Sequence, residues 1–114
     1  MHTEVKLFKS LSDINRIRIL KMLEVRPLCV CEITEILGLA PSTVSKHLSL
    51  LRDAELINDF KDGKWVNYNL NQSTRDIRAG QILELMEGWF PDDETIKNDK
   101  QQALGIDRNL VCGS

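Results

Sequence analysis

The stretch ITEILGLAPSTVSKHL, residues 33–48, decides the fold of this chain. Its apolar spacing predicts a short helix that ends at Gly38, a residue typical of helix C-terminal caps. Pro41 then suits the first position of a second helix, because the N–H that proline lacks has no partner there. Val44 and Leu48 lie one helical turn apart and predict the face of the second helix that enters the core. The pattern indicates two helices joined by a short turn.

The other face of the second helix is polar and partly basic, as expected of a helix that reads the major groove of DNA. At about 100° per residue, Ser42, Lys46 and Ser49 point away from the core face, with Thr43 beside them. His47 lies at the edge of this face, where a packing or hydrogen-bonding role in support of the helix-turn-helix is favoured over a metal-binding role. The candidate DNA-contacting residues of this helix are Ser42, Thr43, Ser45, Lys46, His47 and Ser49.

Two short strands are predicted downstream, over residues 56–61 and 64–70, with Asp62-Gly63 as the hairpin turn between them. Trp65 supplies part of the aromatic content typical of a strand. Lys64, at the start of the second strand, is a candidate contact to a DNA phosphate.

Further helices are predicted on both sides of this unit. Upstream, one covers about residues 3–11 and the next starts after an N-cap at Ser12-Asp13. Downstream, a final helix runs from about residue 74 to Phe90 and is ended by Pro91. Its apolar residues cover more than one face, which indicates a partner surface, most simply on a second copy of the chain. These residues are Ile77, Ile82, Leu83, Leu85, Met86, Trp89 and Phe90.

The predicted fold is therefore mainly α-helical with a β-hairpin wing, the layout of a winged helix-turn-helix. Residues 1–91 are expected to form this DNA-binding and dimerisation domain, and residues 92–114 a polar C-terminal tail.

Composition is consistent with one domain and no membrane span. The 114 residues are 42% hydrophobic, and no apolar run approaches the roughly 18 residues of a transmembrane helix. The N-terminus has no signal-peptide pattern, so a cytoplasmic protein is expected. The net charge is −2, with ten Lys/Arg against nine Asp/Glu in residues 1–70 and five against eight in residues 71–114. DNA binding therefore has to rest on the motif rather than on a basic surface.

Cys29 and Cys31 precede the first helix of the pair and form the candidate site for a soft metal. An odd count of three cysteines, in a reducing compartment, favours metal or redox chemistry over a structural bridge. Two residues at positions i and i+2 of a regular helix point about 200° apart, so one ion does not bind both cysteines there. Binding both requires that the first turn of the helix, where the cysteines lie, is non-helical or unwinds. A helix N-terminus is also expected to lower the thiol pKa. The alternative is that both are small apolar filler residues.

The remaining cysteine, Cys112, lies far away in the predicted tail. It is either a third metal ligand, brought back by the tail, or a free thiol. A small cellular thiol is the other possible source of a third sulfur.

Together these motifs resemble the ArsR/SmtB family of bacterial metalloregulatory repressors over about residues 7–90. The resemblance is carried by LSDINRIRIL (11–20), LCVCE (28–32), STVSKHL (42–48), LR (51–52) and GKWVNY (63–68). It implies a homodimer, paired through its first and last helices, that binds an inverted-repeat operator in double-stranded DNA and releases it on binding metal. The Cys-Val-Cys element is similar to that of the arsenite-responsive branch.

Two positions depart from the family patterns. The best-known arsenite sensors have a third cysteine three residues after the second, where this chain has Thr34. Another family site uses Asp and His on the last helix for zinc, and the predicted last helix has no histidine.

The hypothesis from sequence is a repressor, not an enzyme, that leaves DNA when As(III) or Sb(III) binds the Cys29 and Cys31 pair, with Cys112 as a candidate third ligand. One alternative is a repressor that responds to Cd(II), Pb(II) or Zn(II) through the same thiolates. The other is a thiol-based redox sensor. A thiol oxidoreductase is disfavoured, because no thioredoxin-like βαβ pattern surrounds the cysteines.

Overall fold

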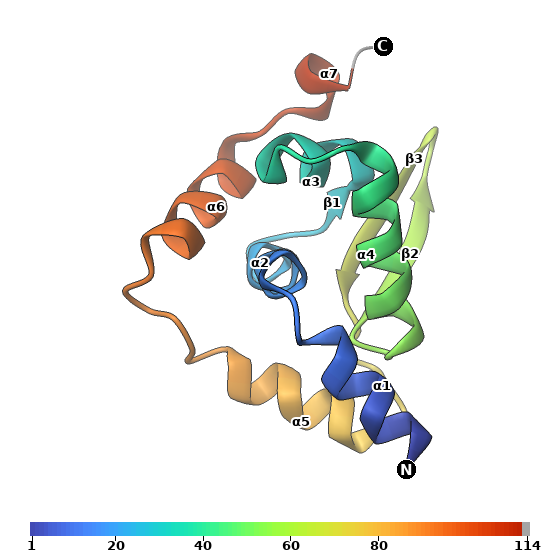
Figure 1. The fold of residues 1–114 in the computed structure, drawn as a ribbon. Coiled ribbons are helices and arrows are strands. Elements are labelled where there is room, and N and C mark those ends of the chain that lie inside the picture. Colours follow the sequence, from blue (N-terminus) through green and yellow to red (C-terminus); the bar gives the residue numbers. More distant parts are fainter. Residues whose placement is uncertain (113–114) are drawn as a thin grey trace.

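Helices make up most of the computed structural model, which describes residues 1–112, and a small sheet lies along one side of it (Figure 1). In order the elements are α1 (His2–Ser10), α2 (Ile14–Leu23), β1 (Leu28–Cys29), α3 (Val30–Leu37), α4 (Pro41–Asp53), β2 (Ile57–Asp62), β3 (Trp65–Leu70), α5 (Ile77–Met86), α6 (Glu94–Gly105) and α7 (Arg108–Val111). The prediction of a mainly helical chain with a hairpin wing is confirmed.

The α3–α4 pair forms for the reasons that its sequence predicts. Gly38 ends α3 with φ of 69°, a left-handed conformation that glycine adopts without strain. Pro41 is the first residue of α4, and Val44, Leu48 and Leu51 are buried along one side of that helix. The polar side of α4 is thereby turned toward solvent.

The sheet is antiparallel with strand order β1-β3-β2. The hairpin turns at Gly63, where φ is 63°. The two-residue strand β1 is not predicted from the sequence, because two residues are too few to show an alternation of apolar and polar side chains. It pairs Cys29 with Asn67 of β3, so the first cysteine lies directly against the wing.

The helix α2 lies at the centre of the molecule, among α3, α4, α5 and α6 (Figure 1). Asp13 caps its start by accepting hydrogen bonds from the backbone N–H groups of Asn15 and Arg16, at 2.7 and 3.3 Å. Its side chains fill the core from Ile19 to Leu23, including the fully buried Lys21. The Lys21 ammonium donates to the Met86 carbonyl, 2.5 Å away, at the end of α5. That helix ends four residues before the predicted Phe90.

Residues 94–105 form the helix α6 instead of the predicted loose tail. Asp93 caps it by accepting from the Ile96 N–H at 3.0 Å. The helix then binds α2 through polar groups: Asp99, 1% exposed, accepts two hydrogen bonds from Arg18, at 2.7 and 2.9 Å. A helix held mainly by ion pairs has no broad apolar stripe, so hydrophobic spacing does not reveal it. Residues 113 and 114 of the predicted tail lie outside the described residues.

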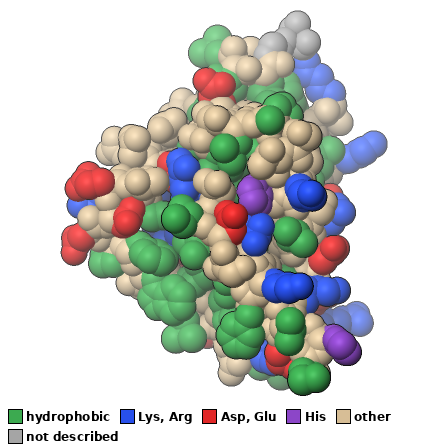
Figure 2. Space-filling model, in the orientation of Figure 1, with side chains coloured by type: hydrophobic (Ala, Val, Ile, Leu, Met, Phe, Trp, Pro, Cys, Tyr) green, Lys and Arg blue, Asp and Glu red, His purple; other side chains and the backbone are tan. Residues whose placement is uncertain are grey.

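Large apolar side chains remain exposed on α1 and α5, which lie at the same end of the molecule (Figure 1). They gather over this lower part of the surface in Figure 2, and we call them the α1–α5 apolar surface. Its members are Val5, Phe8, Ile77 and Leu85, with Trp89 just beyond α5. Leu83 and Met86 are instead buried within the chain's own core. Within residues 1–112, no helix is long and apolar enough to cross a membrane.

Candidate metal and DNA-binding sites

The two cysteines of the Cys-Val-Cys element converge because the first of them stands outside the helix. Cys29 is the N-cap of α3, with an extended backbone (φ −86°, ψ 167°), and Cys31 is the second helical residue. Their sulfur atoms lie 3.8 Å apart. Of the two arrangements that the sequence allows, the structure has the non-helical one, so both sulfurs face one site without any unwinding of α3.

The third cysteine returns to the same place at the end of α7. Cys112 is joined to Cys31 by a disulfide, and the Cα atoms of the two residues are 5.7 Å apart. The sulfur atoms of Cys29, Cys31 and Cys112 all lie within 4.8 Å of one another. Within residues 1–112 this is the one cluster of His, Cys, Asp or Glu side chains with the spacing of a metal site. The structure therefore brings together all three predicted ligands, with two of them in the oxidised state.

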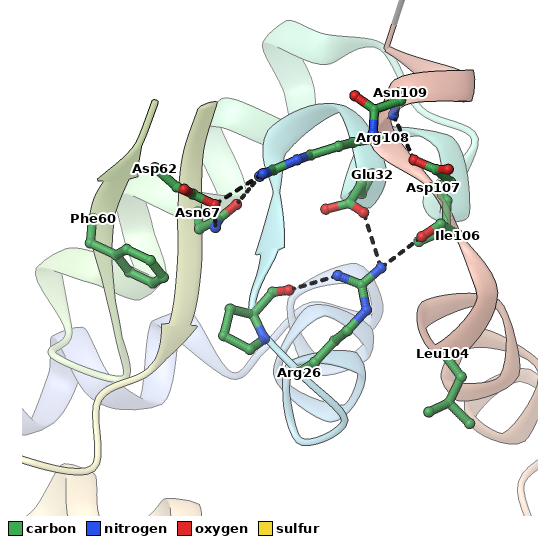
Figure 3. A pocket seen from close by; sticks show the side chains of 11 residues that line it. Arg26, Glu32, Phe60, Asp62, Asn67, Leu104, Ile106, Asp107, Arg108 and Asn109 are labelled. Atoms are coloured by element: carbon green, nitrogen blue, oxygen red, sulfur yellow. Dashed lines mark hydrogen bonds and ion pairs between the residues drawn. The ribbon is translucent and has the colours of Figure 1, made fainter. Parts of the chain in front are cut away.

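The carboxylate of Glu32 (Figure 3) holds the start of α3, the helix that carries Cys31. One oxygen accepts from the Cys29 backbone N–H at 2.9 Å, and the other accepts from the Arg26 guanidinium at 3.0 Å. Glu32 is 3% exposed and both its oxygens have partners. It therefore supports the cluster rather than offering a free ligand atom.

Arg26 extends this support to the segment that carries Cys112. Its guanidinium donates to the carbonyls of Ala103 and Ile106, both at 2.8 Å, and to that of Pro27 at 3.0 Å (Figure 3). One side chain thus ties the start of α3 to the end of α6 and the connection to α7. Sequence reasoning misses Arg26, because its partners Ala103 and Ile106 lie 77 and 80 residues away around a helix that it does not predict. It also misses Glu32, although a glutamate three residues after the N-cap Cys29 is the local spacing of a capping box.

Burial changes the expected chemistry of Cys29. The side chain is 2% exposed, and this burial, together with the neighbouring Glu32 carboxylate, raises the pKa of the thiol above its ordinary value. The expectation that the helix N-terminus lowers this pKa is therefore wrong: backbone hydrogen bonds do favour the thiolate, but burial outweighs them. Burial therefore favours the neutral thiol of Cys29 over its thiolate.

The predicted DNA-contacting side chains lie on the solvent side of α4, with one exception. Ser42, Thr43, Ser45, Lys46 and Ser49 are exposed, and Lys64 is exposed at the tip of the wing. His47 is only 9% exposed, and its Nδ1 lies 3.0 Å from the Arg16 guanidinium. Arg16 also donates to the carbonyls of Ser10 and Lys9 at the end of α1. His47 thus connects α4 to α2 through its contact with Arg16 and does not lie on the exposed face of α4.

Comparisons with known proteins agree with this architecture. Residues 13–59 match the family described as bacterial regulatory protein, arsR family. The chain is 43% identical over 113 residues to the arsenical resistance operon repressor of Escherichia coli K12, covering 95% of this chain and 94% of that one. It is 39% identical over 80 residues to a cadmium resistance transcriptional regulatory protein CadC homolog of Staphylococcus aureus, covering 69% and 63% of the two chains.

Among solved structures, the chain is similar to the winged helix-turn-helix DNA-binding domain of Mb0332 from Mycobacterium bovis. The TM-score is 0.65 at 20% identity, covering 75% of this chain and 76% of that one. This similarity confirms the fold.

Proposed function

The chain belongs to the ArsR family of bacterial regulatory proteins, and we propose that it represses transcription as a homodimer on operator DNA and is released by As(III) or Sb(III). Family membership makes the protein a transcriptional regulator rather than an enzyme. The observation that carries the choice of inducer is the group of three sulfur atoms within 4.8 Å, from Cys29, Cys31 and Cys112.

Three sulfur ligands suit a trivalent metalloid better than zinc or cadmium. Soft thiolates select soft ions, and arsenic and antimony are satisfied by three of them. Structural zinc in proteins almost always takes four ligands. Within residues 1–112 no fourth His, Cys or carboxylate joins the cluster, and the nearby Glu32 is already engaged by Arg26 and the Cys29 N–H. The cadmium and zinc alternatives therefore have less support from this donor set, whereas lead(II) also accepts three thiolates.

The inducer requires the reduced protein, because the disulfide occupies two of the three sulfurs. Two small thiols reduce it: they leave as one disulfide, and Cys31 and Cys112 each gain a proton as free thiols. Arsenite, As(OH)₃, then exchanges its three hydroxyl groups for three sulfurs, and the thiol protons leave with those groups as three waters. The same disulfide supports a second candidate function, a redox sensor in which oxidation of Cys31 and Cys112 is itself the signal.

Release of DNA follows from where the three sulfurs are anchored. Cys29 lies in β1 against the wing strand β3, and Cys31 lies in α3, which packs on α4. A ligand that draws the sulfurs together therefore acts on both predicted DNA-contacting elements. Only a difference in inducer affinity between free and DNA-bound protein drives release, so DNA must weaken inducer binding by the same factor.

Arsenite and the divalent metals differ in where the thiol protons go on binding, so the pH dependence of binding distinguishes arsenite from cadmium and lead. Arsenite takes up the thiol protons as water, whereas Cd²⁺ or Pb²⁺ releases them to solvent. Because the pKa of Cys29 is raised, its thiol remains protonated across the neutral range. Between about pH 6 and 7.5 we expect arsenite-induced operator release to keep the same midpoint. Cadmium affinity should rise up to tenfold per pH unit for each released proton.

Fluorescence anisotropy of labelled operator, titrated at several pH values with the reduced protein, measures both midpoints. Cys29→Ser and Cys31→Ser should still bind operator and should fail to respond to arsenite. Release by cadmium or peroxide, with no response to arsenite, would overturn the proposed inducer in favour of one of the alternatives.

The exposed polar side of α4 predicts the DNA contact. Lys46→Ala should cost about 1–3 kcal/mol of operator affinity if Lys46 contacts a base, and should reduce the salt dependence if it contacts a phosphate. Lys97→Ala, an exposed lysine on α6, is the matched control and should leave operator binding unchanged. Equal affinity and salt dependence for both variants would remove Lys46 from the interface.

The α1–α5 apolar surface supports the homodimer, because exposed apolar patches of this kind mark interfaces. Ile77→Glu combined with Leu85→Glu should give monomers in sedimentation experiments at micromolar concentration. Operator affinity should fall as well, since two half-sites need two linked readers. Leu104→Glu, at an equally exposed leucine on α6, is the control and should remain dimeric. A double variant that stays dimeric would move the interface elsewhere.

A further inference from the structure

The short helix α7 is attached to the wing by one side chain, Arg108 (Figure 3). Its guanidinium donates to the Asp62 carboxylate at 3.0 Å and to the Asn67 side-chain oxygen at 3.3 Å. Its Cζ atom also lies 5.0 Å from the centre of the Trp65 ring. Asp62, Trp65 and Asn67 all belong to the hairpin, so Arg108 contacts the wing through two polar groups and one aromatic face.

The opposite end of α7 belongs to the cysteine cluster. Cys112 follows Val111, its backbone N–H donates to the Arg108 carbonyl at 2.9 Å, and its sulfur is bonded to Cys31. One helical turn therefore has the cluster at one end and the wing at the other. Asn67, which accepts from Arg108, is also the partner of Cys29 in the β1–β3 pairing.

Few of the residues of α7 itself are covered, although the helix contacts α3. None of its four residues is buried, and Leu110 is 82% exposed. A helix of one turn is not stable by itself. Its placement therefore depends on the sulfur of Cys112 and the guanidinium of Arg108, in addition to its contact with α3 and the Arg26 hydrogen bond to Ile106 just before it.

Arg108 lies beside the residue of the wing that is predicted to contact DNA. The Lys64 ammonium is 4.9 Å from the centre of the same Trp65 ring that Arg108 contacts. The two cations share one aromatic ring, so the contact that Arg108 makes with Trp65 affects the ring that Lys64 also contacts. When α7 is held against the wing, Arg108 therefore acts on the position of Lys64 and restrains the hairpin through Asp62.

We propose that Arg108 is the positioning residue that couples the third thiolate to the wing. When the inducer binds Cys112 together with the other two cysteines, α7 is drawn against the hairpin. Arg108 then holds the hairpin away from the position that the hairpin takes on DNA. Without that sulfur contact, α7 separates from the wing and Lys64 is free to approach a phosphate. This inference rests on the proposed function and adds to it the path from Cys112 to the DNA-binding surface.

The test uses Trp65 as the reporter, in the full-length reduced protein with Trp89→Phe so that Trp65 is the sole tryptophan. Arsenite binding is followed by the ultraviolet absorption of the sulfur–arsenic bonds that form. Docking of α7 on the wing is followed by the fluorescence emission of Trp65. With native Arg108, both signals should change together. With Arg108→Ala, the absorption should still develop, with an affinity within about threefold, and the Trp65 change should be lost. The factor by which arsenite weakens operator binding should also be at least fivefold smaller in Arg108→Ala than in the parent protein.

Three further variants separate this role from a merely structural one. Asp62→Asn removes the wing-side partner and should act in the same direction as Arg108→Ala. Arg75→Ala, an exposed arginine in the loop before α5, should behave as the parent. If Arg108 acts through Cys112, the effects of Arg108→Ala and Cys112→Ser on DNA release should not be additive. The double variant should then release DNA as well as the more impaired of the two single variants does.

The outcomes distinguish the two levels of the proposal. No sulfur-to-arsenic absorption in the parent protein would overturn the proposed function itself. Normal absorption together with a normal Trp65 change and normal operator release in Arg108→Ala would overturn only the coupling through Arg108. Additive losses in the double variant would do the same, since they would mean that the two residues act independently.

Discussion

The arrangement of the cysteine site depends on one ion pair, that between the buried Glu32 and the partly exposed Arg26. The carboxylate holds the Cys29 N–H, so the helix α3 begins one residue later and Cys29 stays outside it. The guanidinium holds carbonyls of Ala103 and Ile106, so the chain after α6 runs back toward α3. Removing Arg26 would leave the buried Glu32 carboxylate without its cation, which is costly. The contact therefore fixes the direction in which Cys29 points and helps to bring the chain that carries Cys112 back to it.

Much of the fold follows from local sequence patterns, and the exceptions share a physical cause. Gly38, Pro41 and Asp62-Gly63 mark turns whose backbone requirements few other residues meet, so the α3–α4 pair and the hairpin are predictable. The strand β1 is too short for any pattern. The helix α6 is held by Asp99 and Arg26, whose partners are 81 and 77 residues away in the sequence. Pairing at that range leaves no local signal.

The candidate site divides in the same way. Spacing indicates that Cys29 and Cys31 form a pair, and the exposed side of α4 follows from helical periodicity. The position of Cys112 beside them does not follow from the sequence, since it requires α6 and the Arg26 contacts. His47 shows the limit of periodicity: it lies at the edge of the polar face, and its contact with Arg16 determines which way it turns. The raised pKa of the Cys29 thiol likewise depends on burial, which the helix N-terminus alone does not indicate.

The central claim is that this chain supplies all three sulfurs to one metalloid. Arsenic K-edge X-ray absorption tests it most directly, on protein reduced with a phosphine so that no added thiol completes the site. The account predicts three sulfur neighbours per arsenic in the wild-type protein and two in Cys112→Ser. Two sulfur neighbours in the wild type, or the same number in both proteins, would contradict it.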